Sequence, residues 1–285
     1  MLELIEILKA FIFGIIQGIT EWLPISSTGH LILANSLLKL NQPIDFINLF
    51  LVVIQFGSIL AVVTLYFNKL NPLSPKKTAD EKKETWIMWM KVLIAVLPAA
   101  VLGLIFDDII ESYLSSPLVI SLTLIIYGIL FIVIESRKNT PKITSISQMS
   151  IRTALIIGFC QVLAMIPGTS RSGATILGAV LIGTSREVAA EFSFFLAIPV
   201  MFGASLLRTV KYILENGFMF ENGGGWILLI GTAVSYIVSV FAIKFLMGYI
   251  RKHDFKAFGY YRIILGIVVI LYFSFAGGLL AIVSA

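Results

Sequence analysis

Long apolar stretches alternate with short polar ones along the whole chain. Six of the apolar stretches come close to the roughly 20 residues that a helix needs to cross a bilayer. They fall at about residues 46–67, 86–106, 117–134, 188–214, 226–247 and 260–283. The pattern therefore predicts an all-α polytopic membrane protein with six transmembrane helices.

Two further apolar stretches are each interrupted by polar residues. In the first, residues 2–23 and 31–38 are separated by Pro24-Ile25-Ser26-Ser27-Thr28-Gly29-His30. In the second, residues 151–166 and 176–182 are separated by Pro167-Gly168-Thr169-Ser170-Arg171-Ser172-Gly173-Ala174-Thr175. The second piece of each pair is too short to span a bilayer, and irregular backbone at that depth is tolerated only where it lines a cavity. Each pair is therefore predicted to form a re-entrant helical hairpin.

The composition agrees with an integral membrane protein. Of the 285 residues, 58% are hydrophobic and 13% are charged, and the mean hydropathy is +0.98. A soluble domain carries roughly 25% charged residues. The single Cys160 permits no internal disulfide, and Glu3, Glu6 and Lys9 do not form the basic start of a signal peptide. We expect one integral membrane domain over residues 1–285.

The basic residues predict the orientation of the chain. They concentrate in three polar segments, 68–85, 135–152 and 249–262, and such segments normally lie in the cytoplasm. These residues are Lys69, Lys76, Lys77, Lys82, Lys83, Arg137, Lys138, Lys142, Arg152, Arg251, Lys252, Lys256 and Arg262. The acidic segments around 107–111 and 215–221, and both termini, are then expected outside. The net charge of +5 is thus attributed to membrane topology and not to nucleic-acid binding.

The two interrupted regions also indicate an internal repeat, with repeat one at 1–145 and repeat two at 146–285. The matching pairs, at offsets of 143 or 144, are Gly14 with Gly158, Gln17 with Gln161, Pro24 with Pro167, Ser27 with Ser170, and Gly29 with Gly173. One hairpin and three crossings in each half make the repeats inverted. Inverted repeats place a site at the midplane where their broken helices meet.

The second polar interruption carries Arg171, which predicts the kind of ligand. A charged arginine at the bilayer centre costs roughly 2.5 to 3.5 kcal/mol on insertion scales, so it should face protein, water or an anion. A planar guanidinium binds phosphate oxygens in a bidentate manner. Gly168, Ser170, Ser172 and Thr175 add amide and hydroxyl donors. We predict a phosphate site; the alternative is an arginine that snorkels to the interface.

In the first region, Gln17 and Glu21 stand four residues apart and therefore share one face of a helix. An acid within a membrane span is a functional candidate by default. Glu21 is a candidate to bind a divalent cation, to orient a water molecule or to accept a proton. The alternative is a hydrogen bond inside the helix bundle.

The polar residues that follow Glu21 are candidates for the chemical step and for substrate binding. His30 is a candidate general acid, base or nucleophile, and Ser27 is a candidate nucleophile. Ser26 and Thr28 are expected to bind substrate. The alternatives are an interior histidine with satisfied hydrogen bonds and serines that bond only to the backbone.

Taken together, three motifs resemble a known family. They are Gln17-x-x-x-Glu21, Pro24-x-Ser26-Ser27-Thr28-Gly29-His30, and Pro167-Gly168-x-Ser170-Arg171-Ser172-x-x-Thr175. The resemblance is to undecaprenyl pyrophosphate phosphatases, the bacitracin-resistance proteins of bacterial membranes, and covers nearly the whole chain. Glu191-Phe192-Ser193-Phe194 with Pro199 is similar too, and Glu191 is expected either to support the site or to form a structural salt bridge. In the family, the first position of the Gln17-x-x-x-Glu21 motif is Glu or Gln. Because it is Gln17 here, a mechanism that needs two carboxylates is disfavoured, and Glu21 is expected to be the functional acid.

This resemblance implies hydrolysis of undecaprenyl diphosphate to the monophosphate carrier and inorganic phosphate, for peptidoglycan synthesis. Arg171 would hold the diphosphate, and Ser27, His30 or water would attack. Gln17, Ser26, Thr28, Gly168, Ser170, Ser172 and Thr175 would bind substrate. The resemblance also implies a divalent cation, Mg or Ca, bridged to the substrate by Glu21. The expected location is the bacterial cytoplasmic membrane, with the site reached from the outer face; oligomeric state, including a homo-oligomer, stays open.

A second functional class also fits the repeat pattern. Inverted repeats with broken midplane helices are typical of secondary transporters, so a transporter or lipid-carrier flippase is the alternative. The cluster of Ser27, His30 and Arg171 favours chemistry. Release of phosphate by purified protein in detergent would distinguish the two classes.

Overall fold

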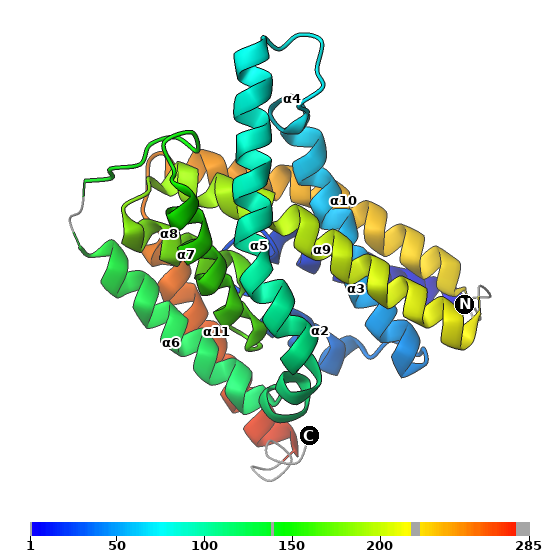
Figure 1. Cartoon of the computed structure of the whole chain (residues 1–285). Helices are drawn as coiled ribbons and strands as arrows, with labels where there is room; N and C mark the ends of the chain where they lie inside the picture. Colours follow the sequence, from blue (N-terminus) through cyan, green and yellow to red (C-terminus); the bar gives the residue numbers. More distant parts are fainter. Residues whose placement is uncertain (1, 138–139, 218–222, 278–285) are drawn as a thin grey trace.

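The computed structural model describes residues 2–137, 140–217 and 223–277, and this part of the chain is helical without any β-sheet (Figure 1). In chain order, its elements are α1 (Leu2–Thr20), α2 (Ser27–Leu38), α3 (Ile44–Leu65), α4 (Phe67–Leu70), α5 (Ala79–Leu114), α6 (Pro117–Glu135), α7 (Ile151–Val162), the 3-10 helix η1 (Leu163–Met165), α8 (Arg171–Ile182), α9 (Arg186–Asn216), α10 (Gly224–Ile250) and α11 (Lys256–Gly277).

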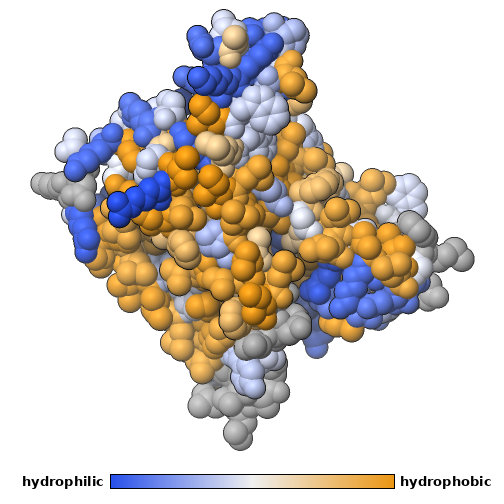
Figure 2. Space-filling view, in the orientation of Figure 1, coloured by the Kyte–Doolittle hydropathy of each residue, from blue (hydrophilic) through white to orange (hydrophobic). Residues whose placement is uncertain are grey.

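Six of the described helices are long and apolar enough to cross a membrane: α3, α5, α6, α9, α10 and α11. They coincide with the six stretches expected from hydropathy, so the prediction of an all-α multi-pass membrane protein is confirmed. Figure 2 shows a broad hydrophobic surface, with hydrophilic residues at the top, where α4 and the start of α5 lie, at the upper left, and at the lower right toward the end of α9. The protein thus presents to lipid the apolar belt that its composition requires.

The two interrupted regions contain more helix than the sequence pattern predicted. Helix α2 begins at Ser27 and α8 begins at Arg171, so the polar residues from Ser27 to His30 and from Arg171 to Thr175 lie in first turns and not in loops. The sequence pattern missed these first turns because it located helices by their apolar residues, and the first turns of α2 and α8 are polar. The connecting segments 21–26 and 166–170 are correspondingly short.

Small residues allow the helices that lead into these segments to pack closely. Helix α1 packs on α10, and α7 packs on α5. A Cβ atom at Gly14 would lie 2.7 Å from the carbonyl oxygen of Gly231, and one at Gly158 would overlap the carbonyl oxygen of Ala95. Glycine is needed at both positions because membrane helices gain stability from close backbone approach.

Two assignments made from the charge pattern change in the structure. Arg262 does not belong to a cytoplasmic loop, because α11 already begins at Lys256 and the Arg262 side chain is 0% exposed inside the bundle. Asp107, Asp108 and Glu111 lie along the helical backbone of α5 instead of in a loop. Lys138 and Glu221, which the charge pattern assigns to opposite faces, lie outside the described residues, as do the two chain ends.

Candidate active site

The carboxylate of Glu21 is the point where the two interrupted regions meet. Its Oε2 accepts hydrogen bonds from Gln17 Nε2 at 2.9 Å and from Ser27 Oγ at 3.0 Å. Its Oε1 accepts one from Arg171 Nη2 at 3.0 Å. Gln17 lies on α1, Ser27 starts α2 and Arg171 starts α8, so one buried acid joins three elements. The structure therefore brings together four of the residues that the sequence singled out.

Arg171 is held in place by further contacts. Its Nη1 donates to the carbonyl oxygen of Ser193 on α9 at 2.8 Å, and its guanidinium lies 5.7 Å from the centroid of the buried Trp22 ring. The Arg171 side chain is 12% exposed, so it does not snorkel to an interface. Its Nε atom is buried without a hydrogen-bond partner in the described structure. The guanidinium is thus oriented by protein and retains unused donor capacity.

Two hydroxyls predicted to bind substrate are used within the protein. Ser172 Oγ donates to the carbonyl oxygen of Glu21 at 3.2 Å. Thr175 Oγ1 lies 2.8 Å from the carbonyl oxygen of Arg171, to which it donates, and 2.7 Å from Ser193 Oγ. Both Ser172 and Thr175 are buried. In this structure they fix the positions of Glu21 and Arg171.

Two serines cap the half-helices with the same unusual backbone conformation. Ser26 precedes α2 with φ 73°, and Ser170 precedes α8 with φ 72°. Their side-chain oxygens accept from the amides of Gly29 at 3.4 Å and of Gly173 at 3.2 Å. A left-handed conformation in a non-glycine residue costs roughly 1 to 3 kcal/mol and persists where the surroundings impose it. Ser26, and not Ser27, is therefore the structural counterpart of Ser170.

His30 faces α11 and not the serine that stands three residues before it. Its Nδ1 lies 2.7 Å from the carbonyl oxygen of Ser26, and its Nε2 lies 2.7 Å from the hydroxyl of Tyr261, whose ring stacks on the imidazole. Because a carbonyl can only accept, Nδ1 carries the proton and Nε2 accepts from Tyr261. Ser27 bonds to Glu21 instead, and Thr28 is exposed at the edge of the site.

The second polar segment is anchored from two sides. Gly168 has φ +88°, and a Cβ atom there would overlap Thr123 Oγ1 on α6, so only glycine fits. The same Thr123 hydroxyl donates to the carbonyl oxygen of Pro167 at 2.7 Å. From the other side, Arg262 Nη2 donates to the carbonyl oxygens of Gly168 and Thr169, each at 2.9 Å. Gly168 is therefore required for the turn in the backbone and for its close packing against α6.

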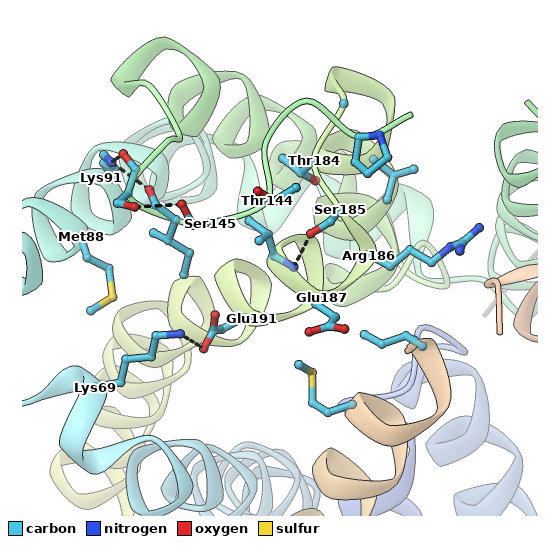
Figure 3. Close-up of a pocket in the computed structure, with 18 of the residues that line it drawn as sticks. Lys69, Met88, Lys91, Thr144, Ser145, Thr184, Ser185, Arg186, Glu187 and Glu191 are labelled. Carbon is cyan, nitrogen blue, oxygen red and sulfur yellow. Dashed lines mark hydrogen bonds and ion pairs between the residues drawn. The ribbon is translucent and has the colours of Figure 1, made fainter. Parts of the chain in front are cut away.

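A large cavity lies elsewhere, among the starts of α5 and α9 and the end of α10. It measures about 1070 Å³, and none of the residues predicted to be catalytic or to bind substrate lines it. Figure 3 shows charged side chains around it, including Lys69 and Glu191, whose ion pair spans 2.6 Å. Of the two roles considered for Glu191, the structure shows the salt bridge.

An aromatic layer stands between this cavity and Arg171. Tyr66 lines the cavity and packs on Phe194 with ring centroids 6.4 Å apart. Phe194 in turn meets Trp22 edge to face at 5.2 Å, and Trp22 lies beneath Arg171. Trp22 and Phe194 are both fully buried. The charged cavity and the Glu21–Arg171 pair are therefore separate features of the fold.

The site offers two oxygens that suit a hard divalent cation. Gln17 Oε1 is buried without a hydrogen-bond partner in the described structure, although its amide nitrogen bonds to Glu21. A carboxylate and an amide oxygen are ligands that Mg and Ca accept, and Mg commonly completes its shell with water and substrate phosphates. Among the described residues, no group of three or more His, Cys, Asp or Glu side chains gathers to hold a metal alone. These two oxygens therefore suit a cation whose remaining ligands would be water and the phosphates of a substrate.

Three residues of this site were not identified from the sequence. Ser193, Tyr261 and Arg262 contact Arg171, His30 and the two polar segments respectively. Ser193 could have been identified from its place in the motif Glu191-Phe192-Ser193-Phe194, which resembles the family. Tyr261 and Arg262 stand where the basic segment 249–262 overlaps the start of the predicted membrane span 260–283, so the sequence assigned them to topology.

These features define a polytopic membrane protein with an acid, an arginine and hydroxyl groups at two helix starts buried inside the bundle. The bacitracin resistance protein family BacA matches residues 10–268, and the chain belongs to this family. The chain is 59% identical over 268 residues to an undecaprenyl-diphosphatase of Lactobacillus delbrueckii subsp. bulgaricus, which covers 93% of this chain and 97% of that protein. It is 58% identical over 270 residues to an undecaprenyl-diphosphatase of Enterococcus faecalis, covering 94% and 98%.

Proposed function

We propose that this chain hydrolyses undecaprenyl diphosphate to undecaprenyl phosphate and inorganic phosphate, which returns the lipid carrier to peptidoglycan synthesis. The observation that carries the proposal is the Glu21–Arg171 pair, 3.0 Å apart and joined to the Ser27 hydroxyl. The family membership and the identity to known undecaprenyl-diphosphatases supply the substrate. The lipid tail then lies among the apolar helices while the diphosphate enters the polar site.

Arg171 and the starts of α2 and α8 bind the diphosphate. Helix N-termini favour anions, and both of these begin at residues that bond to one carboxylate. When substrate binds, Arg171 Nη2 donates to the terminal phosphoryl group instead of to Glu21. The Glu21 carboxylate is then available for proton transfer. Arg171 stabilises the charge that develops in a loose phosphoryl-transfer transition state.

Ser27 is the nucleophile and Glu21 is its base. The Ser27 hydroxyl donates to Glu21 Oε2 at 3.0 Å, which is the contact between nucleophile and base that such chemistry needs. Ser27 Oγ forms a bond to the terminal phosphorus, the bridging P–O bond breaks, and undecaprenyl phosphate leaves. Water then hydrolyses the phosphoserine, releasing inorganic phosphate and regenerating the hydroxyl. His30, held by Tyr261 and Ser26, supports the Ser26–Ser27 turn.

A divalent cation, Mg or Ca, would complete the site when substrate is bound. Glu21 and the unpartnered Gln17 Oε1 are the oxygens that would hold it. Bound there, it would offset the charge of the diphosphate and polarise a phosphoryl oxygen. Gln17 also orients the Glu21 carboxylate through its amide nitrogen.

The chain is proposed to be one domain of two inverted repeats, 1–145 and 146–285, each with a re-entrant hairpin. Matched contacts support this arrangement: α1 packs on α10 through Gly14, and α7 packs on α5 through Gly158. The like-shaped caps at Ser26 and Ser170 support it as well. With the basic segments in the cytoplasm, both termini lie outside and substrate reaches the site from the outer face.

Phosphate release from a prenyl diphosphate by purified protein in detergent tests the function. Wild type is expected to release phosphate without any membrane gradient, and Arg171→Ala is expected to be nearly inactive. A transporter without hydrolase activity would release none. Chelation followed by titration with Mg or Ca tests the cation, since activity that is insensitive to chelation would remove it from the proposal.

A further inference from the structure

Arg262 joins the two polar segments without contacting either catalytic side chain. Its Nη1 donates to the carbonyl oxygen of Pro24 at 3.3 Å, and its Nη2 donates to those of Gly168 and Thr169 at 2.9 Å each. Pro24 precedes α2, and Gly168 and Thr169 precede α8. A single guanidinium on α11 therefore connects segments that are more than 140 residues apart in the sequence.

The environment of this arginine does not explain it as a packing residue. It is 0% exposed, and among the described residues no carboxylate forms an ion pair with it. Its guanidinium lies 5.6 Å from the ring centroid of Tyr127 and 6.0 Å from that of Phe131. Burial of a charge without an ionic partner costs free energy that an apolar side chain at the same position would not cost. The guanidinium is thus retained for its donors, which are arranged in a planar fork.

We propose that Arg262 is a positioning residue that holds the starts of α2 and α8 in register for catalysis. The carbonyl oxygens that it binds lie one or two residues before Ser26 and Ser170, the caps with positive φ. Both caps need surroundings that impose this conformation. Arg262 supplies one common restraint to both.

The catalytic contacts depend directly on this restraint. Glu21 and Ser27 stand on either side of Pro24, and Arg171 follows Thr169 by two residues. A shift of either segment changes the Glu21–Arg171 and Glu21–Ser27 distances, each 3.0 Å. A misplacement of about 1 Å can reduce the rate about a hundredfold. The fit is close on the α8 side, where a Cβ atom at Gly173 would lie 3.2 Å from Arg262 Nη1.

The kinetic test compares Arg262→Lys and Arg262→Met with a matched control, Lys91→Met. Lys91 is also a buried cation, and it donates to the carbonyl oxygens of Ile146 and Ser147, away from the site. A lysine ammonium group cannot bond to both segments, and a methionine side chain donates no hydrogen bond. Both Arg262 variants are therefore expected to lose about a hundredfold in kcat with KM within about threefold. Lys91→Met is expected to keep wild-type kcat.

A structural readout accompanies the kinetics, because the inference rests on the proposed function. Hydrogen–deuterium exchange of peptides covering residues 24–30 and 166–174 should accelerate in both Arg262 variants and stay unchanged in Lys91→Met. Wild-type exchange in Arg262→Met, full kcat in either Arg262 variant, or a loss confined to KM would overturn the positioning role. If wild type itself releases no phosphate, the proposed function fails while the exchange measurement still decides on Arg262.

Discussion

Replacing Glu21 with glutamine removes the charge at the centre of the site while retaining its shape. The amide oxygen of the new side chain can still accept from Arg171, which lies 3.0 Å from Glu21 Oε1. The amide nitrogen then faces Ser27 and Gln17, whose hydroxyl and amide groups can turn to accept. We therefore expect Glu21→Gln to fold and to keep its helical bundle.

The size of the activity loss follows from the contacts. A hydrogen bond to a charged group contributes roughly 1.5 to 3 kcal/mol, and each 1.36 kcal/mol corresponds to about a tenfold change in rate. Glu21 accepts such bonds from Ser27 and Gln17, and it is also the proposed base for Ser27, a role worth roughly a hundredfold or more in rate. The expected loss in kcat/KM is therefore about a hundredfold or more. Gln17→Ala removes only one bond to this carboxylate, from a neutral amide, and a value at the lower end of that range, about 1.5 kcal/mol, predicts about a tenfold loss.

Gln161→Ala is the matched control for Gln17→Ala. Gln161 stands at the corresponding place on α7, is 3% exposed, and has no side-chain hydrogen bond in the described structure. The residue four positions later is Met165 and not an acid. Loss of this glutamine should therefore leave phosphate release close to wild type.

The assay is phosphate release in detergent, measured for each variant across pH and across Mg or Ca concentration. If Glu21 holds a cation, excess metal should partly restore Glu21→Gln. If Glu21 acts only as a base, added metal should leave the variant slow, and raised pH should help. Equal and small losses in Glu21→Gln and Gln17→Ala would refute the reasoning and make the pair structural.

Three further predictions address the anchor, the nucleophile and the topology. Arg171→Lys should remain nearly inactive in phosphate release, because a point charge cannot reproduce the planar fork; near-wild-type turnover would refute bidentate binding. Ser27→Ala should lose at least about a hundredfold in kcat and should not yield the acid-quenched phosphoprotein that is expected with wild type; retained turnover would exclude Ser27 as nucleophile. In a Cys160→Ala background, a cysteine placed at the exposed Lys76 should label only from the cytoplasm, and one at the exposed Tyr113 only from outside; the reverse pattern, or labelling of both from one side, would contradict the proposed orientation.

Local sequence was sufficient for the spanning helices and for singling out the residues that meet at Glu21. A bilayer requires about 20 apolar residues per crossing and makes a buried arginine costly, so hydropathy alone indicates six helices and draws attention to Arg171. The four-residue spacing of Gln17 and Glu21 likewise suffices to place them on one face of a helix. The hydrogen bond of 2.9 Å between them agrees with that spacing.

Contacts between distant segments required the tertiary structure. Ser27 stands nearer to His30 in the sequence, yet its hydroxyl bonds to Glu21 while His30 turns to Tyr261 on α11. Arg262 ends a basic run, a pattern typical of a cytoplasmic loop, yet the fold buries it against Pro24 and Gly168. Hydropathy and charge indicate whether a residue favours water or lipid. They do not identify a hydrogen-bond partner more than 100 residues away, because that contact forms only when the helices pack.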